Sequence, residues 1–243
     1  MIKQIIIAAA GTGSRMSAKL NIHHSKSLIE YNGKPLIHYL LASAKKAGIK
    51  EFFITANKNN EHIIRKVCKS LDILPVIKII QTGFKNVPFL FTEYLDEKFL
   101  IACGHHFIPP EHFKKLIRKA GKFDVVFSTY ANPPYLLDKK RKVLIVENIK
   151  LSNKIYFKLV DLEKETLPEY YTYARNPYSM SLKILKRFEK NKDYVSILAY
   201  KHWLKGGSVT AITSPMPPEF DYDDEFFKTK KFMDSYFKTQ KSF

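Results

Sequence analysis

The first half of the chain alternates short apolar runs with longer segments in which apolar residues recur every three or four positions. A continuous apolar run such as 4–10 is typical of a strand that is buried on both faces of a sheet. Runs of this kind predict strands at 4–10, 51–56, 76–80, 99–103 and 124–130. The helical spacing predicts helices at 35–47, 63–71 and 109–120. Pro35 suits a first helical position, Asn59 or Asn60 suits a helix cap, and Gly48 suits a helix end.

This alternation of strands and helices predicts an α/β fold. Strand–helix–strand units of this length imply right-handed crossovers and a mostly parallel sheet. Ligands of such sheets bind beyond the carboxyl ends of the strands. We therefore expect the loops after Ala10, Gln81 and Cys103 to lie on one functional edge.

The second half is less regular, but it still shows alternating elements. Strands are predicted at 143–146 and 155–160, with a hairpin across 148–153, and another strand at 208–213. Helices are predicted at 179–189, 195–204 and 225–237. A boundary near residue 135 is compatible with this pattern, although we expect both halves to share one sheet.

Composition and charge narrow the class of protein. The chain has 243 residues, of which 45% are hydrophobic, so a sizeable core is expected and wholesale disorder is excluded. The formal charge is +18, with +12 contributed by residues 1–122 and +6 by the rest. Such a charge favours anionic partners: nucleotides, sugar phosphates, nucleic acid or an acidic membrane surface. A Lys-, Ile- and Asn-rich genome would produce the same excess, so both explanations are open.

Missing features narrow the location and the partners. Cys68 and Cys103 are too few for a disulfide framework, and residues 1–7 lack the layout of a signal peptide. No uncharged apolar run reaches the roughly 18 residues that a membrane span needs. We therefore expect a cytoplasmic protein without a membrane span. No helix-turn-helix, zinc-finger or RNA-recognition motif is present, so nucleic acid is an unlikely partner.

The loop after the first strand has the chemistry of a phosphate site. Small residues and two glycines, Gly11 and Gly13, let backbone N–H groups approach a phosphate closely. Arg15 adds a planar fork that suits phosphate oxygens, and Lys26 adds a mobile point charge. The loop is neither a Walker A motif nor a dinucleotide fingerprint, because Gly-Lys-Ser/Thr is absent and Met16 replaces the third glycine.

The segment as a whole resembles the nucleotidyltransferase superfamily that includes the MobA-like and sugar-phosphate nucleotidyltransferases. The signature of that superfamily is Ala-Ala-Gly-x-Gly-x-Arg-Met, a short loop, Pro-Lys-x-Leu, and Gly-Lys-Pro-Leu-Ile. This chain matches it at Ala9, Ala10, Gly11, Gly13, Arg15, Met16, Lys26, Leu28, Gly33, Lys34, Pro35, Leu36 and Ile37.

The resemblance implies a Rossmann-like, three-layer αβα fold with a mostly parallel mixed sheet, of the nucleotide-diphospho-sugar transferase type. It also implies one domain over 1–243, with a nucleotide-binding half at 1–130 and an acceptor-binding half at 131–243. The implied partners are an NTP and a phosphorylated small-molecule acceptor, a sugar phosphate or a phospho-alcohol, and the by-product is pyrophosphate. The implied nucleotide-binding residues are Ala9, Ala10, Gly11, Thr12, Gly13, Gln81 and Gly104, with Arg15 and Lys26 as catalytic residues.

Base recognition and acceptor binding each have an alternative. A Gln81 amide can read a pyrimidine edge, or it can simply face solvent. The superfamily usually has a Gly-Thr pair about five residues later, where this chain has Asn86-Val87-Pro88. Residues 170–176 can line an acceptor pocket or can form an ordinary sheet edge. The superfamily often has an Asn-x-Gly-x-Tyr pattern here, which Asn176 and Tyr178 match in part.

The metal site departs from the superfamily pattern. The resemblance implies Mg²⁺, with Mn²⁺ as an alternative, held by an Asp-x-Asp segment that matches Asp221 and Asp223. Alternatively, Asp223 or Asp224 simply caps the helix that begins near Glu225. The superfamily also has a Gly-Asp pair at the end of the fourth strand, whose Asp is a principal Mg²⁺ ligand. This chain has His105 at that Asp position, after Gly104. Three interpretations are open: a softer divalent ion such as Mn²⁺ or Zn²⁺, a metal held by Asp223 and the triphosphate alone, or a protein that binds a nucleotide or sugar phosphate without turnover.

Overall fold

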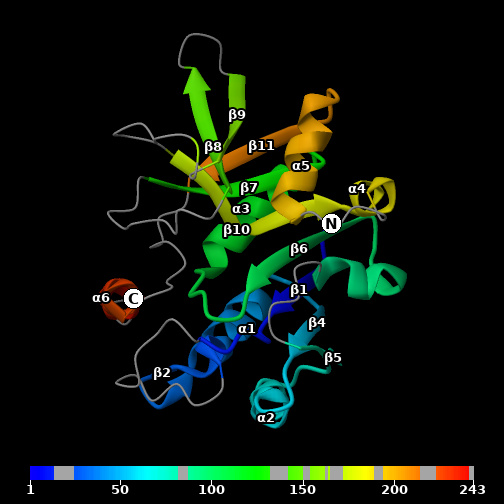
Figure 1. The fold of residues 1–243 in the computed structure, drawn as a ribbon. Helices are drawn as coiled ribbons and strands as arrows, with labels where there is room; N and C mark the ends of the chain where they lie inside the picture. The colour runs from blue at the N-terminus through cyan, green and yellow to red at the C-terminus, as the bar shows by residue number, and fades with distance from the viewer. Residues whose placement is uncertain are drawn as a thin grey trace.

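The computed structural model describes residues 1–13, 25–81, 87–131, 142–149, 154–161, 164, 172–188, 194–213 and 223–240 (Figure 1). The strands are β1 (Gln4–Ala8), β2 (Glu30–Tyr31), β3 (Lys34–Pro35), β4 (Glu51–Ala56), β5 (Val76–Ile79), β6 (Lys98–Cys103), β7 (Val125–Ala131), β8 (Lys142–Ile149), β9 (Lys154–Asp161), β10 (Thr172–Ser181) and β11 (Val209–Thr213). The α-helices are α1 (Leu36–Lys46), α2 (Glu61–Ser70), α3 (Pro110–Ala120), α4 (Leu182–Arg187), α5 (Val195–Leu204) and α6 (Asp223–Gln240). Two 3₁₀ helices are η2 (Lys26–Leu28) and η3 (Val87–Tyr94). The predicted strands and helices of the first half are all present, with small differences in their ends.

One central sheet runs through both halves of the chain. Its strands lie in the order β11-β7-β10-β6-β1-β4-β5, and the antiparallel hairpin β8–β9 joins it through β10. Pairs β1–β4, β1–β6, β4–β5 and β7–β11 are parallel, whereas β10 is antiparallel to both β6 and β7. The predicted mostly parallel, mixed sheet and the hairpin at 148–153 are therefore confirmed.

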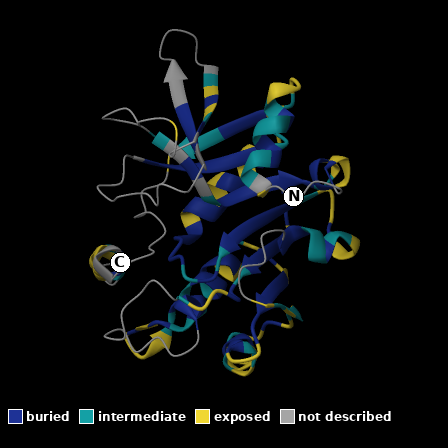
Figure 2. Cartoon of the chain, in the orientation of Figure 1, coloured by how far each residue is buried: buried dark blue, intermediate teal, exposed yellow. Residues whose placement is uncertain are grey.

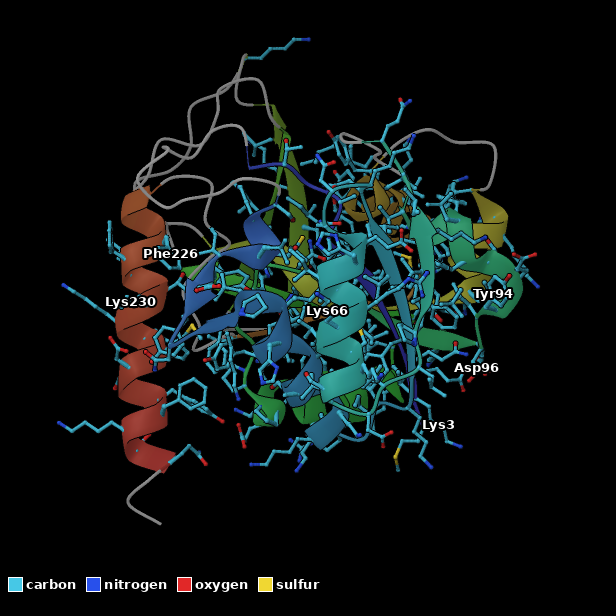
Figure 3. The ribbon with its side chains drawn as sticks, turned by 90° about the horizontal axis from the view of Figure 1, so that it is seen from below. Lys3, Lys66, Tyr94, Asp96, Phe226 and Lys230 are labelled. Carbon is cyan, nitrogen blue, oxygen red and sulfur yellow. The ribbon has the colours of Figure 1, made fainter. Side chains whose placement is uncertain are left out.

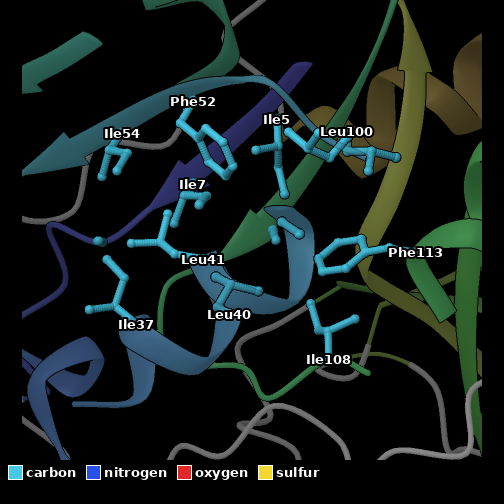
Figure 4. Close-up of a cluster of buried hydrophobic side chains, with 14 of the residues drawn as sticks. Ile5, Ile7, Ile37, Leu40, Leu41, Phe52, Ile54, Leu100, Ile108 and Phe113 are labelled. Atoms are coloured by element: carbon cyan, nitrogen blue, oxygen red, sulfur yellow. The ribbon is translucent and has the colours of Figure 1, made fainter. Parts of the chain in front are cut away.

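Helices cover both faces of this sheet. Ile5 and Ile7 pack with α1, α2 and α3 in one buried cluster, part of which Figure 4 shows with Phe113 of α3. Ile6 points to the other face and packs with η3, α4 and α5. Alternate residues of one strand thus enter two separate cores, which explains why the run at 4–10 is continuously apolar. Figure 2 shows the strands buried between helices whose outer sides are exposed, which confirms the three-layer αβα fold.

The last helix, α6, lies outside the two sheet faces and covers the segment that leads into α1. Phe226 and Met233 of α6 are buried against Tyr31, Leu36 and Phe107, whereas Lys230 is exposed (Figure 3). The Asp234 carboxylate accepts a hydrogen bond of 2.7 Å from the Tyr31 hydroxyl. The last residues of the chain therefore stabilise the segment that follows the predicted phosphate loop. Within the described ranges, no helix is both long and apolar enough to cross a membrane.

Two predictions about the second half were wrong. Residues 179–181 were expected to begin a helix, but they belong to β10 and pair with both β6 and β7. Pairing on both sides, with Met180 fully buried, overrides the local helical pattern. The sheet-edge alternative for 170–176 also fails for the described residues 172–176, because β10 lies between two strands. The 3₁₀ helix η3 was not predicted.

Candidate nucleotide-binding site

The carboxyl ends of β1, β4 and β6 meet at one edge of the sheet. These strands are neighbours and parallel, so the segments that follow them lie side by side. Residues 9–13 follow β1, residues 57–60 follow β4, and residues 104–106 follow β6. The expected juxtaposition of the loops after Ala10 and Cys103 is therefore present.

Side-chain donors hold the backbone carbonyls where the loop after β1 begins. The Asn60 Nδ2 donates to the Ala9 carbonyl at 2.8 Å, and the Asn57 Nδ2 donates to the Ala10 carbonyl at 3.0 Å. The Ser25 hydroxyl also donates to the Ala9 carbonyl, at 3.0 Å. Asn57, Asn60 and Ser25 are buried, so these bonds are protected from water. Two consecutive carbonyls thus point into the protein.

The orientation of these carbonyls decides where the neighbouring N–H groups point. In a trans peptide the N–H points opposite to the C=O, so the N–H groups of Ala10 and Gly11 point away from the donors. Within the described ranges, no residue accepts a hydrogen bond from the N–H of Gly11, Thr12 or Gly13. Gly13 has a φ of +74°, and a side chain at Gly11 would meet nothing within 4 Å. The loop can therefore offer several N–H groups to an anion.

Lys26 lies in a segment that two serines attach to this loop. Ser25 precedes η2, its Oγ accepts from the Ser27 N–H at 3.3 Å, and the two hydroxyls are 2.7 Å apart. Both hydroxyls donate to the Ala9 carbonyl, that of Ser25 at 3.0 Å and that of Ser27 at 3.5 Å. The Lys26 side chain is buried, with 7% of its surface exposed, rather than mobile as the sequence suggested. The structure therefore places Lys26, as a buried residue, in a segment attached to the start of the loop.

Gly104, at the end of β6, packs against the loop after β1 and against the Lys26 segment. Its N–H donates to the Ala8 carbonyl at 2.8 Å. A Cβ at this position would lie 2.8 Å from the Ala9 Cβ and 3.1 Å from the Ser27 Cβ. No other residue type fits without movement of the backbone, so Gly104 permits close contact between β6, the loop and the Lys26 segment.

The described residues do not fit a Mg²⁺ site. His105 follows Gly104, and its ring lies 5.1 Å from that of His106, centre to centre. Imidazole is a poor ligand for Mg²⁺, which prefers oxygen. Nowhere in the described ranges do three His, Cys, Asp or Glu side chains gather to hold a metal. Asp223 begins α6, but its side chain and the whole of Asp221 lie outside the described part.

Gln81 and Asn176 lie near this edge, while other predicted residues cannot be located. Gln81 is exposed just beyond β5, where the Ile80 N–H donates to the Ala56 carbonyl at 2.9 Å. Asn176 of β10 reaches the end of β6, because its Nδ2 donates to the Cys103 sulfur at 3.3 Å. Arg15 and Asn86 lie outside the described residues.

Sequence reasoning missed the residues that hold the loop. Asn60 was predicted only as a helix cap, and it does precede α2, but its side chain makes no capping hydrogen bond. Its Oδ1 instead accepts from the Asn57 N–H at 2.9 Å, while its Nδ2 holds the Ala9 carbonyl. A signal was available, because asparagines at 57, 59 and 60 follow a buried strand directly.

The chain is similar to known nucleotidyltransferases. A model of the MobA-like NTP transferase domain matches residues 5–150, and no curated protein matches the chain. One similar structure is the inositol-1-phosphate CTP transferase from T. maritima (TM-score 0.69, 18% identity, 95% of each chain covered). Another is a putative glucose-1-phosphate thymidylyltransferase from Bacillus anthracis (TM-score 0.72, 15% identity, 94% of each chain). A third is the 4-diphosphocytidyl-2C-methyl-D-erythritol synthase from Anaerococcus prevotii (TM-score 0.60, 17% identity, 96% of this chain and 98% of that one). The structures share the fold, the family model covers more than half of the sequence, and the chain therefore belongs to the MobA-like NTP transferase domain family.

Proposed function

We propose that the protein transfers NMP from an NTP to a sugar phosphate or a phospho-alcohol. A phosphate oxygen of the acceptor attacks the α-phosphorus, the bond between the α-phosphorus and its bridging oxygen to the β-phosphate breaks, and pyrophosphate leaves. A reaction of this type needs in-line positioning and neutralisation of charge more than a protein nucleophile. The family and the similar structures support the general kind of reaction.

The observation that carries this proposal is the anchored loop beside Lys26. Because Asn57, Asn60 and Ser25 hold the carbonyls of Ala9 and Ala10, the N–H groups of Ala10 and Gly11 are available to the triphosphate. The Lys26 ammonium next to them stabilises the charge that develops on the pyrophosphate. Arg15, in the segment between the loop and Lys26, is assigned the same role.

The remaining residues are assigned by their position at the same edge. Gln81 is exposed beyond β5, where its amide reads the base. Residues 1–130 hold the nucleotide, and residues 131–243 hold the acceptor beside the end of β6. The sequence pattern assigns Asp223 to a magnesium ion, which would supply charge neutralisation at the triphosphate. His105 contributes an imidazole where the superfamily pattern has an Asp, so no step of this reaction is assigned to a protein-bound metal.

A second candidate function is binding of a nucleotide or a sugar phosphate without turnover. The observation that favours it is His105 at the end of β6, since imidazole suits Mg²⁺ poorly and no group of three possible metal ligands gathers among the described residues. His105→Asp distinguishes the two candidates: it raises Mg²⁺-dependent activity if the position has lost a ligand. If His105 serves a new role in the enzyme, the same change lowers activity.

Pyrophosphate release tests the proposal directly. The purified protein is incubated with ATP, GTP, CTP, UTP or dTTP, a panel of sugar 1-phosphates, inositol 1-phosphate and phosphocholine, and either Mg²⁺ or Mn²⁺. Release that requires one NTP together with one acceptor, and that Arg15→Ala abolishes, supports the transferase. NTP binding by calorimetry without any release would overturn it in favour of the binding protein.

A further inference from the structure

His112 is a buried, uncharged imidazole that the proposed reaction does not use. It lies in the first turn of α3, on the helix face that packs against the sheet, and only 2% of its surface is exposed. Burial, with a smaller contribution from Lys115, lowers the pKa of His112 to about 4, so the ring is neutral at pH 7. Its Nε2 lies 2.8 Å from the Ser128 hydroxyl.

Ser128 also forms a hydrogen bond with β10. Val126 and Tyr130, two positions to either side on β7, belong to the apolar core, so Ser128 is a polar interruption of that stripe. Its hydroxyl donates to the Pro177 carbonyl at 2.5 Å, and it therefore accepts from the Nε2–H of His112. A continuous chain of hydrogen bonds links α3 through β7 to β10.

These hydrogen bonds lead to an irregularity in the pairing of β10. Arg175 pairs with Ser128 and Tyr178 pairs with Phe127, so one step along β7 corresponds to three along β10. Two extra residues, Asn176 and Pro177, are thereby pushed out of the ladder. Bulges of this kind re-aim side chains and are common next to active sites.

Both carbonyls of this bulge are held from β7. The Tyr130 hydroxyl donates to the Asn176 carbonyl at 2.6 Å, and Ser128 holds the Pro177 carbonyl. The Asn176 side chain is turned to the end of β6, where its Nδ2 donates to the Cys103 sulfur at 3.3 Å. Its Oδ1 is buried and has no hydrogen-bond partner among the described residues. Cys103 directly precedes Gly104, which contacts the nucleotide loop.

We propose that His112 and Ser128 are positioning residues that hold the Asn176–Pro177 bulge so that the Asn176 amide faces the acceptor. When the sugar or polyol substrate binds, the Oδ1 that is buried in the free protein accepts a hydrogen bond from one of its hydroxyls. This inference rests on the proposed function. A buried imidazole and hydroxyl are unfavourable in a core unless they bond to each other, and a valine at 128 would continue the apolar stripe. The polar pair is explained by the backbone conformation that it selects in β10.

Ser128→Ala, compared with Ser179→Ala, tests the inference. Both serines are buried on adjacent strands, but the Ser179 hydroxyl has no partner among the described residues. We expect Ser128→Ala to raise the KM for the acceptor about tenfold, as loss of one buried hydrogen bond does, and to leave the KM for the NTP unchanged. His112→Gln, which keeps an N–H donor, should be milder than His112→Leu. Asn176→Ala combined with Ser128→Ala should be no worse than Asn176→Ala alone.

A second measurement needs no turnover. In ¹⁵N-labelled protein the side-chain amide signal of Asn176, identified by its loss in Asn176→Ala, should move in Ser128→Ala and stay in Ser179→Ala. If Ser128→Ala matches Ser179→Ala in both the KM and the amide signal, and only lowers stability, the inference is overturned. If the wild-type protein transfers no NMP to any acceptor, the proposed function fails, and the amide signal by itself decides whether the pair positions Asn176.

Discussion

The two edges of the central sheet use polar residues in opposite ways. At the carboxyl edge, the neutral side chains of Asn57, Asn60 and Ser25 hold backbone carbonyls. At the amino edge, the Asp124 carboxylate before β7 contacts the Lys183 ammonium at 2.6 Å and the His202 ring at 3.0 Å. At the amino edge, charged side chains neutralise one another within the protein. At the carboxyl edge, side chains satisfy the backbone carbonyls of Ala9 and Ala10, and the adjoining N–H groups face outward.

This difference separates stability from function. A closed ion pair stabilises the fold and offers nothing to a ligand. An anchored loop with outward N–H groups can exchange the water bound to them for an anion. Changes at the carboxyl edge should therefore reduce activity more than stability, and changes at the amino edge should do the reverse.

The largest effect is expected for Lys26→Ala. If Lys26 stabilises the reacting phosphates as proposed, its removal should lower kcat about 100-fold, the magnitude typical of a lost electrostatic stabiliser. Lys58→Ala, an exposed lysine after β4 at the same edge, is the matched control and should leave kcat unchanged. Steady-state kinetics of pyrophosphate release measure both variants. Equal kcat in the two variants would remove Lys26 from the site.

Gly104→Ala should affect both properties, because Gly104 joins the site to the core. The added Cβ would lie 2.8 Å from the Ala9 Cβ, so the backbone must shift, at about 2 kcal/mol of unfolding free energy. In Gly121→Ala the nearest atom is the Arg118 carbonyl oxygen at 3.4 Å, an ordinary contact. Urea unfolding should separate these two variants. An unchanged midpoint for Gly104→Ala would show that the close contact is not tight.

Asp124→Asn should reduce stability and leave activity intact. Burial raises the pKa of Asp124, but hydrogen bonds from Lys183, His202 and Ser208 outweigh it and lower the pKa from 3.8 to about 2. A lowered folded-state pKa contributes stability that is present above pH 4 and lost as the pH falls from about 4 to about 2. We expect Asp124→Asn to lower the free energy of unfolding by about 2 kcal/mol at pH 7. Between pH 4 and pH 2 the free energy of unfolding of the variant should also fall less steeply than that of the wild type. Urea titrations at pH 7 and pH 3 measure both effects, and a fall as steep as in the wild type would contradict the assignment.

The smallest effect is expected for Gly11→Ala. The added methyl group meets nothing in the protein within 4 Å, so the melting temperature should not change. If the triphosphate occupies that space, the KM for the NTP should rise, by about tenfold. A melting curve without ligand and a KM measurement make the comparison. An unchanged KM would place the phosphates elsewhere.

The sequence predicted the first half well because its elements are local. The apolar run at 4–10 and the spacing of Leu36, Leu40 and Ala44 reflect burial on a strand or on one helix face, which periodicity reports directly. The glycine loop and Lys26 were predicted as a phosphate site because phosphate chemistry restricts the residue types within a short segment, and that role stays a prediction. Ser179 was misassigned, because pairing with two distant strands decides its conformation.

What the sequence by itself determined is the fold class and the family, and it predicted the glycine loop as an anion site. Only the tertiary structure decided how that loop is held, because Asn60 and Ala9 are 51 positions apart and Ser25 and Ala9 are 16 apart. The same holds for Asn176, which reaches Cys103 through a bulge that pairing with β7 defines. Hydrogen bonds between distant residues depend on where the sheet brings strands together, and local patterns of polarity carry no information about that distance.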